Sequence, residues 1–160
     1  MQPAADLVAE ILEGYANRGV FRGFSRGPVR GGKAGFKMLW HRDRFFDLAL
    51  DPRRKTMTFP VVLPQVPATS PMNREYREFV KSRSDRGLPG HRRIDPKKAV
   101  VEPFNRGGNV GLRITVKAGA YEYATRKLIH LVHETFLVFL YDGRYYDYLI
   151  ETFDLDPDKF

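Results

Sequence analysis

The sequence contains no cysteine and no long apolar run, and both absences exclude classes of protein. Without a thiol there are no disulfide bonds, no cysteine nucleophiles and no zinc or iron–sulfur sites with cysteine ligands. The most apolar stretch, residues 128–141, is too short to span a bilayer, and His130, His133 and Glu134 interrupt it. No base precedes Arg18, whereas a secretory signal begins with basic residues. We therefore expect a cytoplasmic protein with no membrane segment.

Acidic residues are too few to balance the basic ones. The 160 residues include 27 Lys and Arg but only 19 Asp and Glu, which gives a net charge of +8. Residues 18–55 hold eleven bases and three acids, and residues 74–98 hold nine bases and four acids, whereas both ends of the chain are acidic. Such a balance favours anionic partners. Two interpretations are open: an ordinary solvated surface, which charge alone favours, or a nucleic-acid-binding surface.

The length and the 42% of apolar residues predict one folded domain with its own core. We expect this domain to span residues 1–153, with an acidic tail at residues 154–160. Apolar side chains at helical spacing predict a helix at residues 6–15. Residues 18–35 are rich in glycine and arginine and show no apolar periodicity, which predicts a loop.

Period-2 alternation of apolar and polar side chains predicts strands, each with one buried face. A Ser70–Pro71 pair predicts the start of a middle helix, because serine caps helices and proline suits their first position. After the first helix, the predicted elements are strands at residues 36–41, 44–50 and 55–63, the middle helix from residue 70, strands at 99–104 and 110–116, and helices at 120–141 and 145–153. Consecutive strands between helices predict an α+β fold, with an antiparallel sheet of about five strands, the order α-β-β-β-α-β-β-α-α, and helices packed on the sheet.

Two motifs suggest catalytic or metal chemistry, and neither carries it. Residues 27–34 approach the phosphate-binding loop, but Ala34 stands where a hydroxyl must bind magnesium, and the segment does not lie between a strand and a helix. His130, His133 and Glu134 share a helix face, which the polar side of an amphipathic helix explains as well as a metal site does. No nucleophile–base set is evident. We therefore expect no enzymatic activity, no cofactor and no metal.

An apolar patch continues the polar stripe of the last long helix. Its members are Leu137, Val138, Tyr141, Tyr145 and Tyr148. Such a patch indicates contact with another element or with another chain. Packing against the final helix and a dimer contact both remain open, and the two are compatible.

A second candidate surface combines arginines with aromatic residues. Arginine neutralises phosphate, and phenylalanine stacks on unpaired bases. The candidate nucleic-acid-binding residues are Arg18, Phe21, Arg22, Phe24, Arg26, Arg30 and Lys33 of the Gly/Arg loop, with Arg92 and Arg93 of the later basic segment.

The predicted element order resembles the type III secretion chaperone-like fold, which includes the YbjN-like proteins. The similarity is greatest from Asn109 to Leu140, and residues 36–41, 44–50 and 55–63 fit the three-stranded meander of that fold. The resemblance implies a non-enzymatic α+β domain, often a homodimer, that binds protein partners, in some cases by strand addition and hydrophobic grooves. It brings no catalytic motif.

These observations favour a protein-interaction module without enzymatic activity, chaperone-like or regulatory and homodimeric. The alternative is a single-stranded nucleic-acid-binding protein that uses the Gly/Arg loop. The sequence identifies neither the protein partner nor the ligand.

Overall fold

The structure is a computed structural model that describes residues 3–141 and 145–152, apart from the side chain of Arg42. The predicted acidic tail lies outside the described residues. The elements are α1 (Ala4–Asn17), β1 (Gly23–Arg26), β2 (Ala34–Leu39), the 3₁₀ turn η1 (His41–Asp43), β3 (Phe45–Asp51), β4 (Thr56–Leu63), α2 (Pro71–Ser82), β5 (Ala99–Arg106), β6 (Asn109–Val116), α3 (Tyr121–Glu134), the π-helical segment η2 (Thr135–Tyr141) and α4 (Tyr146–Thr152). The predicted α+β fold is confirmed.

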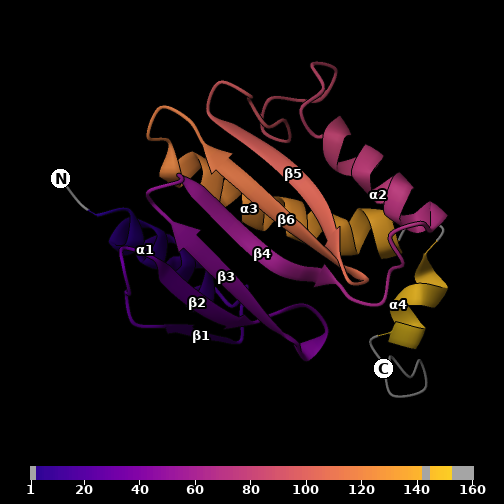
Figure 1. Cartoon of the computed structure of the whole chain (residues 1–160), viewed down its shortest axis with the longest axis horizontal. Coiled ribbons are helices and arrows are strands. Elements are labelled where there is room, and N and C mark those ends of the chain that lie inside the picture. Colours follow the sequence, from indigo (N-terminus) through magenta and orange to yellow (C-terminus); the bar gives the residue numbers. More distant parts are fainter. Residues whose placement is uncertain (1–2, 142–144, 153–160) are drawn as a thin grey trace.

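The strands form one antiparallel sheet in the order β1-β2-β3-β4-β6-β5 (Figure 1). The sheet has six strands, one more than expected, because β1 forms inside the predicted Gly/Arg loop. Gly23 pairs with Leu39, and Arg26 pairs with Phe36. Four residues flanked by glycines are too few for an alternating pattern to appear in the sequence.

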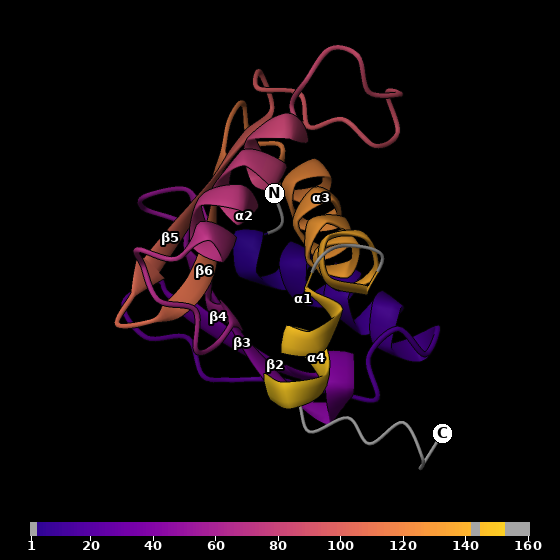
Figure 2. The same cartoon turned by 90° about the vertical axis from the view of Figure 1, so that its right-hand side faces the viewer.

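Among the residues that the structure describes, helices cover one face of the sheet and leave the other face uncovered. Figure 2 shows α1 and α3 together on one side, and α2 lies alongside the edge strand β5 (Figure 1). Alternate side chains of the strands point under the helices and are buried, as in the pairs Met38 and Phe46, and Leu112 and Ile114. The positions between them face solvent, which gives the sheet one open face. In the part of the chain that the structure describes, no helix is both long and apolar enough to cross a bilayer.

The middle helix begins where the sequence predicts. The Ser70 hydroxyl accepts a hydrogen bond from the Asn73 backbone N–H at 3.2 Å, and Pro71 occupies the first turn. The helix ends at Ser82, whose hydroxyl donates to the Phe79 carbonyl at 2.6 Å.

The long final helix changes its geometry at Thr135, where a continuous helix was expected. There the Thr135 hydroxyl donates to the Leu131 carbonyl at 2.8 Å and contacts the buried Tyr76 hydroxyl at 2.8 Å. Phe136 and Phe139 are both buried along the widened segment. We infer that the wider turn lets the aromatic side chains reach the core while the opposite face stays in solvent.

Two glycines offer opposite tests of this packing. A Cβ on Gly111 would lie 2.6 Å from the Phe59 carbonyl oxygen and 2.7 Å from that of Pro60, where the β4–β6 register shifts. Gly111→Ala is therefore expected to lower the free energy of unfolding by about 1–3 kcal/mol. A Cβ on Gly14, within α1, meets nothing within 4 Å, so Gly14→Ala is expected to raise it by about 0.5–1 kcal/mol. Urea denaturation measures both, and equal effects would contradict the assigned strand register.

Candidate functional site

The predicted contact cluster separates into an exposed part and an inward part. Leu137, Val138 and Tyr141 are exposed, and Tyr146 of α4 joins them through an edge-to-face contact with Tyr141 at 5.6 Å between ring centres. These four side chains are 39–53% exposed, and they make up four of the seven exposed large apolar side chains among the described residues. We call them the apolar end patch.

Tyr145 and Tyr148 belong to the fold rather than to this surface. Tyr145 stacks on Phe139 with ring centres 5.1 Å apart. The Tyr148 hydroxyl donates to the Pro64 carbonyl, and burial raises the pKa of Tyr148. The sequence could not separate these two tyrosines from Tyr146, because a helix as short as α4 has too few turns to define a buried face.

Glu134 is a buried carboxylate of α3 with three basic side chains around it. It is only 5% exposed, and its carboxylate lies 2.8 Å from the Arg83 guanidinium, 3.2 Å from that of Arg92 and 3.1 Å from His130 Nε2. Burial raises the pKa of this carboxyl, but the hydrogen bonds from His130 and Arg92 and the charges of His130 and Arg83 outweigh burial and lower the pKa to about 2.

The sequence pattern places Glu134 on the exposed polar face of the helix, but in the structure its side chain is buried. Its carboxylate is engaged by cationic side chains. Burial lowers the pKa of His133, and the neighbouring charge of His130 lowers it further. No group of His, Asp or Glu able to hold a metal ion occurs within residues 3–141 and 145–152.

The Glu134 ion pairs fasten the connection between α2 and β5 onto α3. Further bonds act in the same way: Lys127 Nζ donates to the His91 carbonyl at 2.8 Å, and the Tyr123 hydroxyl accepts from the Asp95 backbone N–H at 2.7 Å. The Tyr123 hydroxyl also donates to the Arg93 carbonyl at 3.3 Å. Of the two arginines predicted as nucleic-acid contacts here, Arg92 joins these bonds through its guanidinium and Arg93 only through its backbone carbonyl.

The aromatic members of the predicted Gly/Arg surface are not equally accessible. Phe21 is 2% exposed, and its ring packs between those of Tyr15 and Trp40. It is therefore a core residue and cannot stack on a base. Phe24 is half-buried and lies parallel to Phe36, with ring centres 6.2 Å apart.

Most basic members of that surface have partners within the chain. The ion pairs are Arg22 with Asp43, Arg26 with Asp6 at 2.7 Å, and Lys33 with Asp51 at 3.9 Å. Arg18 lies over the Tyr15 ring at 4.8 Å, and Arg30 is exposed in a tight turn. Exposed pairs of this kind contribute little stability, so they leave the arginines in solvent but lower the net charge of the segment.

A groove lies between α2 and β5. It encloses about 460 Å³ and is lined mainly by apolar groups, among them Val80, Ala99 and Val101. Because β5 is an edge strand, one side of its backbone faces this groove. Pro103, also in the lining, has no N–H and interrupts the run of donors along that edge.

The described chain is thus an α+β domain with an apolar end patch, an edge-strand groove and an open sheet face. Comparison with family models, curated proteins and solved structures found no match.

The Glu134 carboxylate predicts a pH-dependent stability. Because its pKa is lowered from 4.5 to about 2, the stabilisation is complete above about pH 5 and is lost as the pH falls towards 2. Glu134→Gln is expected to cost about 3 kcal/mol at pH 7, because it leaves a partly buried guanidinium unpaired. The gap between wild type and variant should close in acid, which urea denaturation from pH 7 downwards measures.

Glu122→Gln is the matched control on the same helix, because Glu122 forms an exposed pair with Arg126 at 3.3 Å. We expect it to cost less than about 0.5 kcal/mol. Equal costs for the two variants would contradict the assigned role of Glu134.

Proposed function

We propose that the protein is a homodimeric interaction module that binds segments of other proteins in a chaperone-like or regulatory role, without catalysing a reaction. The observation that carries the proposal is the gathering of exposed apolar side chains in the apolar end patch. Monomeric proteins rarely keep several large apolar groups together in water, and such patches are typical of interfaces. Apart from the extra strand β1, the element order is the one on which the resemblance to secretion chaperones is based, and it fits such a module.

A second copy of the chain is the occupant that the surrounding charges favour. On one side of the patch, the exposed face of α3 carries Arg126, which pairs with Glu122, and His130, which contacts Glu134. On the other side, α4 exposes Asp147 and Glu151. A two-fold axis through the patch would place the acidic end of each copy near the basic end of the other, since such an interface is self-complementary.

The groove between α2 and β5 is the proposed site for a partner segment. An extended chain can pair with the free edge of β5 while its alternate apolar side chains enter the groove. Val100 and Val101 contribute to the lining at this edge. The groove is lined by residues of α2, β5 and the connection between them, whereas the apolar end patch belongs to η2 and α4, so the proposed dimer uses no residue of the groove.

Charge introduced into the patch is expected to separate the dimer. Leu137→Asp and Tyr141→Asp, tested one at a time, each bury a carboxylate in the proposed interface, which is strongly unfavourable without a partner. Light scattering after gel filtration should give twice 18.5 kDa for the wild type and 18.5 kDa for each variant. Val29→Asp, at an exposed valine far from the patch in the sequence, should remain dimeric. A monomeric wild type, or variants that stay dimeric, would contradict the interface.

Loss of apolar character in the groove is expected to weaken capture of unfolded segments. Val100→Thr combined with Val101→Thr keeps the side-chain shape but removes two methyl groups from the lining. Protection of reduced insulin from aggregation, followed by light scattering, should fall by about fivefold or more. The same change at the exposed Val20 and Val29 should leave protection unchanged. A wild type that gives no protection would argue against a chaperone-like role.

A further inference from the structure

Three segments distant in the sequence bring lysines and an arginine to one end of the sheet. The Val116 backbone N–H donates to the Lys55 carbonyl at 2.7 Å, and the Lys117 N–H donates to the Lys98 carbonyl at 2.9 Å. The turn between β3 and β4, the residues before β5 and the residue after β6 therefore lie side by side, at the upper left of the sheet in Figure 1. The exposed bases of this lysine edge are Arg53, Lys55, Lys97, Lys98 and Lys117.

The charge of the lysine edge is not neutralised within the described part of the chain. There, Arg53, Lys55, Lys97 and Lys117 make no ion pair and no contact with a ring, and Lys98 lies over the Tyr123 ring at 4.9 Å. This arrangement differs from that of the Gly/Arg segment, where most of the bases meet carboxylates. The lysine edge is therefore a concentrated positive surface that no short stretch of sequence reveals.

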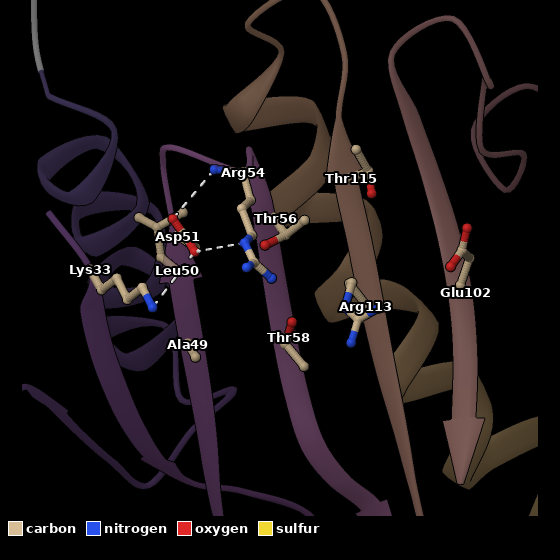
Figure 3. A pocket seen from close by; sticks show the side chains of 10 residues that line it. All are labelled: Lys33, Ala49, Leu50, Asp51, Arg54, Thr56, Thr58, Glu102, Arg113 and Thr115. Atoms are coloured by element: carbon tan, nitrogen blue, oxygen red, sulfur yellow. Dashed lines mark hydrogen bonds and ion pairs between the residues drawn. The ribbon is translucent and has the colours of Figure 1, made fainter. Parts of the chain in front are cut away.

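A trough opens beside this edge on the uncovered face of the sheet (Figure 3). It encloses about 490 Å³. Small side chains from neighbouring strands form its floor: Ala49, Thr56, Thr58 and Thr115. Longer side chains stand around them: Lys33, Asp51 and Arg54 on one side, and Glu102 and Arg113 on the other (Figure 3). Hydroxyl and guanidinium donors of this kind suit the oxygens of a phosphate chain.

The trough also contains two carboxylates, one on each side of the threonine floor. Asp51 is held by Lys33 and Arg54, each at 3.9 Å. Glu102 stands on the edge strand β5, opposite Arg113 in the register.

Two aromatic rings lie on the same open face, each with a cation beside it. The Phe104 ring lies across Gly111, and the Arg113 guanidinium is 5.2 Å from its centre. Phe45 is 65% exposed, and Lys37 Nζ is 5.5 Å from its ring centre. Gly111 is four residues from Thr115 along β6, so the Phe104 ring lies about 13 Å from the trough floor at Thr115.

We propose that the open face of the sheet binds single-stranded nucleic acid. The lysine edge and the trough hold phosphates, and unpaired bases stack on Phe104 and Phe45. The exposed Phe45 ring and the half-buried Phe104 ring favour a single strand over a duplex, whose bases are already stacked. This site uses residues other than the Gly/Arg loop, and it does not depend on the proposed dimer, because the open face lies on the side of the sheet away from α3 (Figure 2).

Labelled single-stranded DNA and RNA of about 20 nucleotides, titrated with the full chain at about 50 and 200 mM salt, test the proposal by fluorescence anisotropy. The wild type should bind at the lower salt, and its affinity should fall steeply at the higher. Lys55→Glu, Lys97→Glu and Lys117→Glu together should weaken binding at least about tenfold and reduce the salt slope by about 2, because each single-strand phosphate contact contributes about 0.7.

The control triple variant, Arg74→Glu, Lys81→Glu and Arg86→Glu, makes the same change in net charge elsewhere on exposed positions. If the phosphate contacts lie at the lysine edge, this control variant should bind within about twofold of the wild type. Thermal unfolding verifies that both triple variants are folded. No binding at the lower salt, equal losses in both triple variants, or equal displacement of the strand by inorganic polyphosphate of matched charge would each overturn the proposal.

Discussion

Most of the surface arrangement depends on the ion pairs of the buried Glu134 carboxylate. Arg83 and Arg92 approach it from the connection between α2 and β5, and His130 approaches it from its own helix. An ion pair in this position is stable only if all its members are present, because a single buried charge is costly. When all these ion pairs are formed, they fix the connection between α2 and β5. This connection is long and basic and has few apolar residues of its own. The end of that connection delivers Lys97 and Lys98 to the end of the sheet.

Much of the fold could be predicted from the sequence, because its signals are local. Alternation marks β2 to β6, and the Ser70 cap marks the start of α2. Strand β1 was missed because pairing with β2, rather than its own pattern, makes it a strand. The change of geometry at Thr135 was missed because it follows from a long-range contact with Tyr76, which no helical periodicity contains.

The candidate sites were predicted less well, because a site depends on distant residues that the fold brings together. Leu137, Val138 and Tyr141 were identified because they share a helix face, which is a local property. Phe21 was assigned to a surface because it lies among arginines, whereas its ring completes the core. The lysine edge escaped prediction because its members come from three segments, with 42 positions from Lys55 to Lys97 and 19 from Lys98 to Lys117, that meet only through β-sheet pairing.

The two edges of the sheet have a consequence for the protein at high concentration. Strand β1 is four residues long and carries exposed charge, and Pro103 interrupts the donors of β5. Open edges of regular strands are the usual starting points of amyloid-like stacking, and short length, charge and proline are the features that prevent it. The sheet can therefore leave a whole face uncovered and keep one partly usable edge without polymerising through its own strands. The short length, charge and proline of the edge strands thus limit which segments can pair with the sheet and also protect the protein from aggregation.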